Sequence, residues 1–374
     1  MSNVAAATLG PDSIQIRQFP RPPVQEGDML VQIEQVGICG SDKHMYVGHA
    51  KLEFPVVPGH EMVGRIIEMG PEAQTTSQVV GGPLAIGDRV CVTPSSQGCG
   101  RCWFCRNVPH RPALCPNRTV YGFTAARKPP HLHGALAELM LVGPRSNVFR
   151  VPDELPSDRA VLTEPAAVAT RAVQRALGPG IPHIGEGLSI GTRVAVLGAG
   201  PIGLLIVVAL RYMGAGTIIV SDRSTTRLQL ARRLGAQIAL NVQAMEPQDR
   251  LDAARDATDG VGPDVVIEAA GVPAAFQEAL SMVRRGGRVV EVGHYFDSGS
   301  VDVAPHTICH KDVDVLGCWS YPPMQFQIAM SMLAATSAPL EMLLTATMPL
   351  ARTADAVRMT GDAEIIKVVV EPGS

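Results

Sequence analysis

The stretch TRVAVLGAGPIGLLIVVALRYMGAGTIIVSD, residues 192–222, has a pattern that few folds can accommodate. A strand-like apolar run at 192–200 ends in glycines, an apolar run of helical length follows at 201–215, and a second strand-like run covers 217–222. Strands and helices of a parallel βαβ unit are buried on their inner faces, which favours such continuous apolar runs. The stretch therefore predicts a parallel sheet covered by helices.

The same alternation of elements continues to about residue 318. An amphipathic helix pattern at 223–236 is followed by strand-like runs at 264–271, 287–293 and 312–317, with helical stretches between several of them. Repeated strand–helix–strand order is typical of a doubly wound α/β fold.

The beginning and the end of the chain have a different pattern. Short strand-like runs at 29–38, 62–70 and 85–92 are separated by proline and glycine, which predicts an irregular β-rich domain. The final stretch ends in the strand-like EIIKVVVEP, and we expect it to return to the first domain. The predicted domains are residues 1–165, 166–318 and 319–374, the middle one being an insertion.

The glycines after the first parallel strand form a dinucleotide-binding pattern. Gly198, Gly200 and Gly203 make G-x-G-x-x-G between a strand and a helix, and Asp222 lies 19 residues beyond Gly203. The glycines would permit a tight turn, approach of a pyrophosphate and close helix packing, and the helix N-terminus would offer free N–H groups. We therefore expect a nucleotide cofactor in this domain.

Asp222 favours NAD over NADP, because a carboxylate accepts hydrogen bonds from ribose hydroxyls and repels a 2′-phosphate. Arg223 and Arg227 directly follow it and keep NADP open, although a solvated helix face also explains them. The residues expected to bind the cofactor are Gly198, Gly200, Pro201, Ile202, Gly203, Asp222, Arg223, Arg227, Ala270 and Gly293.

Four of the eight cysteines are clustered. Cys99, Cys102 and Cys105 have C-x-x-C-x-x-C spacing, and Cys115 follows ten residues later. Four thiolates complete a tetrahedral zinc site and leave no position for a substrate, so this lobe, about residues 95–117, predicts a structural zinc ion. A metal-free cluster and an iron–sulfur cluster are the alternatives.

A sparser set of residues is the candidate for chemistry. A catalytic zinc ion takes three protein ligands and keeps one position open, and one cysteine, one histidine and one carboxylate suit it. Cys39, His60 and either Glu61 or Glu164 offer these groups. Their separation in the sequence also fits ordinary core or turn residues.

Taken in order, the motifs resemble the zinc-dependent medium-chain alcohol dehydrogenases, most closely their sorbitol dehydrogenase-like branch. They are CGSD-x-H at 39–44, GHE-x-x-G at 59–64, the cysteine lobe, EP at 164–165, GAGPIG at 198–203 and IKVVV at 366–370. The resemblance implies a GroES-like catalytic domain with an inserted Rossmann domain, two zinc ions per chain, and hydride transfer between a secondary alcohol and NAD(P).

The resemblance also implies roles for single residues. Cys39 and His60 would bind the catalytic zinc ion, and Glu61 or Glu164 would complete the shell directly or through water.

Ser41 would accept a hydrogen bond from the alcohol, and His44 would be the outer member of a proton relay. Asp42 would fix the tautomer of His60. Lys367 would lie near the cofactor pyrophosphate, although an exposed strand lysine is the alternative.

The substrate is less constrained. Polyol dehydrogenases of this branch carry an arginine in the segment that matches GCWSYPP at 317–323, whereas this chain has Ser320 there, beside Trp319. Together with Tyr121 and Phe123, this predicts an aromatic pocket for a bulkier or less hydroxylated secondary alcohol, with a polyol left open.

Composition and charge argue against several classes of protein. A net charge of −3 and a pI of about 6.4 disfavour nucleic acid as a partner and argue against a zinc-ribbon binding protein. No apolar run reaches membrane-spanning length, and the start lacks a signal-peptide pattern, so we expect a cytoplasmic protein. The resemblance implies a homodimer or homotetramer. A metal-free NAD(P)H-dependent reductase of the same superfamily is the remaining alternative, and it would not need Cys39, His60 and Glu164.

Overall fold

The computed structural model describes residues 2–95, 98–127, 131–177 and 188–373, which form two compact units. The first unit comprises Met1–Glu164, Tyr321–Ala335 and Leu343–Ser374, and the second comprises Pro165–Ser320 and Thr336–Met342. Residues 96 and 97 of the predicted zinc lobe lie outside the described part of the chain.

The segments 319–320 and 336–342 group with the second unit, whereas the sequence predicted a return to the first domain at residue 319. The last strand of the second unit explains the difference at 319–320, because Cys318 N still donates a 2.8 Å hydrogen bond to the Glu291 carbonyl at the edge of the sheet.

The first unit is rich in β-structure. Its elements before the boundary are β1 Ser2–Gly10, β2 Ser13–Pro20, β3 Met29–Gly37, α1 Gly40–Tyr46, β4 Glu61–Met69, α2 Ala73–Thr76, β5 Gln78–Val80, β6 Arg89–Val92, α3 Trp103–Asn107, η1 Pro112–Leu114, β7 Leu139–Val142, β8 Asn147–Arg150 and α4 Ser157–Ala160. Its later elements are α11 Gln325–Ala335, β15 Leu344–Pro349, η4 Leu350–Arg352, α12 Thr353–Met359 and β16 Lys367–Glu371. Helix α5, Thr163–Ala176, begins in the first unit and continues into the second.

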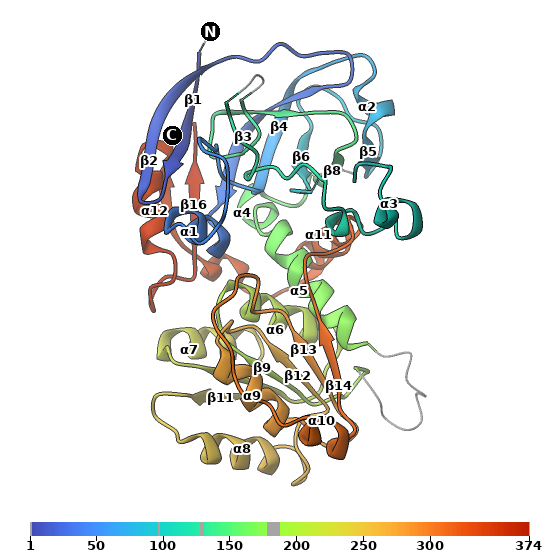
Figure 1. Ribbon diagram of the computed structural model, residues 1–374, viewed down its shortest axis with the longest axis vertical. Coiled ribbons are helices and arrows are strands. Elements are labelled where there is room, and N and C mark those ends of the chain that lie inside the picture. The colour runs from blue at the N-terminus through green and yellow to red at the C-terminus, as the bar shows by residue number, and fades with distance from the viewer. Residues whose placement is uncertain (1, 96–97, 128–130, 178–187, 374) are drawn as a thin grey trace. The chain divides into compact units, whose positions relative to one another are not determined.

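The main sheet of the first unit has the order β15-β16-β3-β4-β6-β8-β5, and β7 also pairs with β3 (Figure 1). The antiparallel pair β3 and β4 places Gly37 opposite Glu61. β16 pairs with β3 from the other side, so a strand near the C-terminus lies beside the ends of two early strands. The end of β3, the start of β4 and the start of β16 therefore lie close together at the same end of these neighbouring strands.

The second unit has the doubly wound α/β fold that the sequence predicted. Its elements are β9 Val194–Leu197, α6 Pro201–Met213, β10 Ile218–Asp222, α7 Thr225–Leu234, β11 Ile238–Asn241, α8 Pro247–Asp256, β12 Val265–Glu268, α9 Pro273–Met282, β13 Arg288–Glu291, α10 Pro305–Lys311, β14 Asp314–Gly317 and η3 Leu340–Leu343, the last of which ends at the first residue of the first unit's final segment.

The six strands of this sheet are parallel in the order β11-β10-β9-β12-β13-β14. Numbered along the chain this is 3-2-1-4-5-6, the Rossmann order, whose direction of winding reverses between β9 and β12. Ligands of such sheets bind beyond the carboxyl ends of the strands at this reversal. The glycine turn after β9 and Asp222 at the end of β10 lie at these ends.

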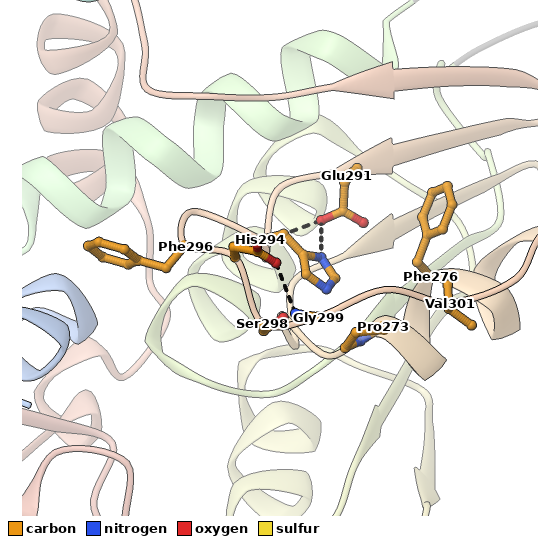
Figure 2. A pocket seen from close by; sticks show the side chains of 9 residues that line it. Pro273, Phe276, Glu291, His294, Phe296, Ser298, Gly299 and Val301 are labelled. Carbon is orange, nitrogen blue, oxygen red and sulfur yellow. Dashed lines mark hydrogen bonds and ion pairs between the residues drawn. The ribbon is translucent and has the colours of Figure 1, made fainter. Parts of the chain in front are cut away.

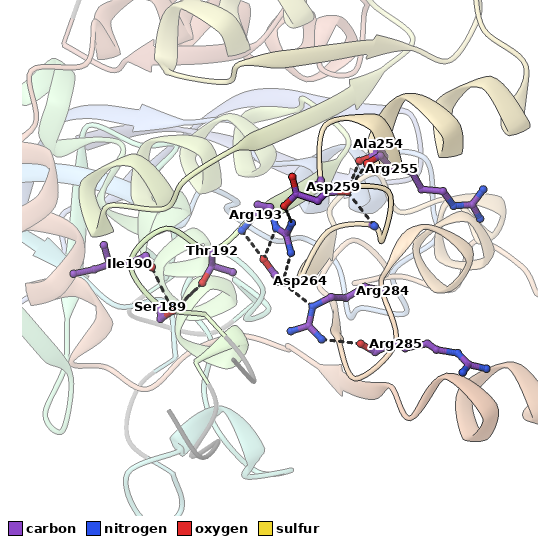
Figure 3. Close-up of polar contacts among 12 residues, drawn as sticks. Ser189, Ile190, Thr192, Arg193, Ala254, Arg255, Asp259, Asp264, Arg284 and Arg285 are labelled. Carbon is purple, nitrogen blue, oxygen red and sulfur yellow. Dashed lines mark hydrogen bonds and ion pairs between the residues drawn. The ribbon is translucent and has the colours of Figure 1, made fainter. Parts of the chain in front are cut away.

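An ion-pair network ties the opposite, amino ends of β9 and β12 together. The Asp264 carboxylate accepts hydrogen bonds from the Arg193 guanidinium at 3.1 and 3.2 Å and from Arg284 at 2.6 Å (Figure 3). These contacts lower the pKa of the Asp264 carboxyl although burial acts to raise it. The network stabilises the sheet at the end away from the glycine turn.

Among the described residues, no helix combines the length and the apolar character that crossing a bilayer requires.

Candidate functional site

Cys39, His60 and Glu61 come together in the first unit. Cys39 follows the end of β3 and His60 precedes β4, and the antiparallel pairing of these strands brings their ends side by side. One donor atom from each of the three residues lies within 4.8 Å of the other two. The thiol, imidazole and carboxylate that the sequence pattern proposed thus converge at one place.

Lys367 belongs to this cluster and does not occupy an exposed position on β16. Its ammonium donates a 3.0 Å hydrogen bond to the Ile38 carbonyl and forms an ion pair with Glu61, and its side chain is only 3% exposed. Gly37 makes room for the pair, because a Cβ there would collide with the Glu61 carboxylate. The structure thus shows Lys367 as a buried partner of Glu61, and its expected place near the cofactor pyrophosphate stays a prediction.

The His60 ring lies between several polar groups. Its Nδ1 is 3.8 Å from Asp42 Oδ1, its Nε2 is 3.4 Å from Ser41 Oγ, and its ring centre is 5.3 Å from that of Phe123. Asp42 uses its other oxygen to accept a 2.9 Å hydrogen bond from Cys39 N, which caps α1. One carboxylate thereby fixes the helix start and faces the imidazole.

The electrostatics of this cluster fit a cation. Burial acts to lower the pKa of His60, but Asp42 and Cys39 raise it to about 10. Within the described residues, His60 Nδ1 and Asp42 Oδ1 are buried without a hydrogen-bond partner. A divalent ion among these ligands would supply the positive charge that the imidazole otherwise carries, so the donor set fits a zinc ion.

Glu164 lies apart from the closest group. It is not among the three residues whose donor atoms converge, and its carboxylate accepts a 2.6 Å hydrogen bond from the Tyr321 hydroxyl. Burial raises the pKa of Glu164 to about 7, since His60 offsets only part of the effect. No role for the Tyr321 hydroxyl could be predicted from the sequence, because its partner lies 157 residues away along the chain.

His44 pairs with a residue that the sequence did not single out. Its Nδ1 lies 3.0 Å from Nδ1 of the exposed His49, so one ring donates to the other. Burial and then His49 lower the pKa of His44, which favours the neutral, proton-accepting imidazole near pH 7. His44 on α1 thus contacts an exposed second imidazole that lies just beyond the end of this helix.

The four clustered cysteines also converge. One sulfur from each of Cys99, Cys102, Cys105 and Cys115 lies within 4.8 Å of the other three. The Arg101 and Cys102 backbone N–H groups lower the pKa of the Cys99 thiol to about 6, which favours its thiolate form, whereas burial raises the pKa of the Cys105 thiol to about 12. Four sulfurs without a further ligand position fit a closed zinc site.

The residues predicted to line the substrate pocket belong to different units. Tyr121 is part of the core of the first unit, where its hydroxyl lies 2.7 Å from Ser146 Oγ and accepts a 3.0 Å bond from Gly143 N. Its assignment to the substrate pocket is therefore corrected. Trp319 stacks on Tyr295 in the second unit with ring centres 6.1 Å apart, and the neighbouring Ser320 has a φ of 53°.

The glycine turn of the second unit has the geometry that a pyrophosphate needs. Gly198 has a φ of 99° and lies against Ala270, while open space surrounds the position of a Cβ on Gly200. Helix α6 begins with Pro201 directly after Gly200. The first N–H groups of the helix therefore face outward from the carboxyl end of β9.

Asp222 is held in place at the end of β10. Its two carboxylate oxygens accept hydrogen bonds from Ala199 N at 2.7 Å and Ser224 N at 2.8 Å. Each oxygen keeps a further lone pair for a ribose hydroxyl. Arg223 is exposed, and Arg227 is half-buried on α7.

Comparison with known proteins decides the family. Residues 25–153 match the alcohol dehydrogenase GroES-like domain, and residues 201–335 match the zinc-binding dehydrogenase domain. The chain is 32% identical to the sorbitol dehydrogenase of Bacillus subtilis, over 99% of this chain and 98% of that protein. The chain belongs to the zinc-dependent medium-chain alcohol dehydrogenases. The erythritol/L-threitol dehydrogenase of Mycolicibacterium smegmatis is 31% identical, over 92% of this chain and 91% of that protein.

Solved structures of this dehydrogenase family agree in fold. An alcohol dehydrogenase from Thermotoga maritima matches with a TM-score of 0.90 at 28% identity, over 99% of both chains. A zinc-binding dehydrogenase from Sinorhizobium meliloti bound to NADP matches with a TM-score of 0.85 at 29% identity, over 100% of both. The 2R,3R-butanediol dehydrogenase from Bacillus subtilis matches with a TM-score of 0.82 at 26% identity, over 99% of both.

Membership of the sorbitol dehydrogenase-like branch establishes the reaction class. This medium-chain dehydrogenase is a zinc-dependent enzyme that transfers a hydride between an alcohol and NAD(P). The prediction of two zinc ions agrees with the cysteine cluster and the catalytic-type group around Cys39.

Proposed function

We propose that the protein oxidises a secondary alcohol to its ketone with NAD, at a catalytic zinc ion held by Cys39, His60 and Glu61. The convergence of these three donors within 4.8 Å carries the proposal. Glu61 is favoured over Glu164 as the carboxylate ligand, because Glu164 lies outside the group and binds the Tyr321 hydroxyl. Lys367 would hold the Glu61 carboxylate in position. It would release this carboxylate when the set of ligands around the zinc ion changes.

Each side chain around the site would have a separate role. Zinc, when bound, supplies a Lewis acid that lowers the pKa of the alcohol and favours hydride loss to the nicotinamide. Ser41 would accept the alcohol proton and donate its own hydroxyl proton to the pair of His44 and His49, which would release a proton to water. Asp42 would keep the His60 ring oriented. Phe123 would give the site an apolar wall beside His60.

The proposed substrate is a secondary alcohol or small diol with fewer hydroxyls than a hexitol. Named relatives act on butanediol, on erythritol and L-threitol, and on sorbitol. Ser320 stands where the resemblance places an arginine in polyol dehydrogenases. The loss of a charged donor removes a contact worth about 1.5–3 kcal/mol to a substrate hydroxyl.

A substrate screen tests this proposal. Initial rates of NAD reduction should give kcat/KM for butane-2,3-diol or cyclohexanol at least about tenfold above that for sorbitol, because one charged hydrogen bond is missing. Sorbitol turning over far faster than the less hydroxylated alcohols would overturn the assignment.

The proton relay makes a separate prediction. Ser41→Ala should lower kcat by about 100-fold or more near pH 7, with partial recovery as the pH rises and hydroxide replaces the relay. His44→Ala should act in the same direction with a smaller effect, while Ser41→Thr, which keeps the hydroxyl, should retain most of the rate. Unchanged rates and pH profiles in both alanine variants would contradict the relay.

We propose NAD as the preferred cofactor because Asp222 is fixed with free lone pairs. Asp222→Ala should lower kcat/KM for NAD by about 10- to 100-fold, because a charged hydrogen bond to the ribose is lost. The same change should raise kcat/KM for NADP. Asp256→Asn, an exposed carboxylate on α8, is the matched control. An NAD-to-NADP ratio that does not move would exclude Asp222 from cofactor selection.

We also propose roles for the cysteine cluster and for the two units. Cys99, Cys102, Cys105 and Cys115 would hold the structural zinc ion. The first unit would act as the catalytic domain and the second as the cofactor domain. A cytoplasmic homodimer or homotetramer is proposed on the resemblance alone.

A further inference from the structure

Three side chains in the second unit form a group that the proposed function does not use. Glu268 ends β12, Glu291 ends β13, and the parallel register of the two strands places these residues side by side. His294 lies three residues beyond Glu291, in the loop that leaves β13. Figure 2 shows the His294 ring turned back toward the Glu291 carboxylate.

The three side chains offer converging donor atoms. His294 Nδ1 is 2.8 Å from Glu291 Oε1 and 3.5 Å from Glu268 Oε2. One donor atom from each residue lies within 4.8 Å of the other two. Neighbouring ligands of one divalent ion with bonds of about 2.1 Å are about 3 Å apart, so small side-chain shifts suffice to fit an ion.

The buried carboxylate of Glu268 points to a bound ligand. It is 0% exposed, and its Oε1 accepts hydrogen bonds from Ala270 N at 2.8 Å and Gly271 N at 2.9 Å. Its Oε2 has no hydrogen-bond partner among the described residues. Gly293 leaves that oxygen room, because a Cβ there would collide with it. The backbone thus orients a buried carboxylate whose second oxygen is directed into the group.

The charges of the group are unbalanced. Two carboxylates, one fully buried, face a single imidazole, and burying uncompensated charge is unfavourable unless a cation or a proton is added. We propose that Glu268, Glu291 and His294 bind a first-row divalent transition-metal ion in the second unit. One imidazole with two carboxylates suits Mn²⁺, Fe²⁺ or Zn²⁺ better than Ca²⁺ or Mg²⁺.

The surroundings leave room for further ligands. Glu291 and His294 line a cavity of about 460 Å³, together with Asp297 and Ser298 (Figure 2). Water or a small anionic molecule would complete the coordination of the ion from this side. The site does not rest on the proposed function, because none of its three ligands is a zinc ligand or an expected cofactor residue. Two of its neighbours, Ala270 and Gly293, are expected to contact the cofactor, so the ion would lie beside it.

A proton shared between the carboxylates is the competing explanation. Burial and then Glu291 raise the pKa of the Glu268 carboxyl to about 8, so a protonated Glu268 would also relieve the repulsion. The two explanations differ in what they predict for metal binding.

Manganese binding to the zinc-loaded protein tests the proposal. Mn²⁺ binds thiolate sites weakly and would not displace zinc from them, and electron paramagnetic resonance reports its free concentration. The wild type should bind one Mn²⁺ per chain with a midpoint below about 100 µM, and the ion should raise the thermal unfolding midpoint. Glu291→Gln and His294→Ala should each weaken this binding at least tenfold and abolish the thermal shift.

Asp297→Asn is the matched control. It removes a carboxylate from the same cavity but keeps the oxygen that accepts from Gly299 N, so it should bind Mn²⁺ like the wild type. Circular dichroism and metal-free unfolding midpoints check that the variants are folded. Absence of Mn²⁺ binding, or equal binding by wild type and both ligand variants, would overturn the proposal and favour the shared proton. Failure of Asp297→Asn alone would place the ion elsewhere in the cavity and overturn the proposed ligand set.

Discussion

Replacement of Cys39 by serine is expected to lower kcat/KM for alcohol oxidation by at least about 1,000-fold, which corresponds to about 4 kcal/mol of transition-state stabilisation. The thiolate is the softest ligand of the group and its loss should empty the site, since a neutral serine hydroxyl binds zinc poorly. Without the metal, neither His60 nor Lys367 can stabilise an alkoxide in its place. Initial-rate assays with the best alcohol of the screen measure the effect.

Cys309→Ser is the control for this variant. Cys309 is exposed on α10, and among the described residues it belongs to none of the groups with converging metal-binding donors. Its replacement should leave kcat/KM within about twofold. If Cys39→Ser keeps more than a tenth of the wild-type kcat/KM, the metal site has been assigned to the wrong residues.

Replacement of Cys102 by serine is expected to act on stability. Cys102 caps α3 by accepting from Cys105 N, and its sulfur lies 3.5 Å from that of Cys105 and 3.8 Å from that of Cys115. Short elements such as α3 and η1 have little core of their own, so the proposed zinc ion would hold them together. Loss of about 3 kcal/mol would lower the thermal midpoint of the first unit, which has about 210 residues, by roughly 6–12 °C. Differential scanning calorimetry measures it.

Arg106→Ala is the matched control, because Arg106 is exposed on the same short helix. Its midpoint should stay within about 2 °C of the wild type. A Cys102→Ser protein as stable as the wild type would show that the lobe does not depend on a metal ion.

The sequence predicted those features that depend on local pattern. Apolar runs of the right length and the glycine turn gave the order of elements in the second unit, because a parallel sheet buries both faces of its strands. The spacing of the four cysteines predicted that they form one cluster. The order of motifs along the chain gave the family, which the match to the sorbitol dehydrogenase of Bacillus subtilis confirmed.

The features that the sequence did not reveal depend on contacts between distant segments. Lys367 looked like an exposed or phosphate-binding lysine, and only the pairing of β16 with β3 shows it beside Glu61. Tyr121 was assigned to the substrate pocket because aromatic residues suit both pockets and cores, and its hydrogen bonds place it in the core. Glu268 and Glu291 meet through strand register, and a strand pattern does not state which strands are neighbours.

Zinc content per chain tests whether Cys39, His60 and Glu61 hold a catalytic metal ion. Elemental analysis would be done on wild type, Cys39→Ser, Cys102→Ser and the double variant, all purified without added metal. The wild type should contain one zinc ion more than each single variant and two more than the double variant, with activity lost whenever Cys39 is replaced. Equal zinc in wild type and Cys39→Ser would contradict a catalytic metal site at Cys39, His60 and Glu61.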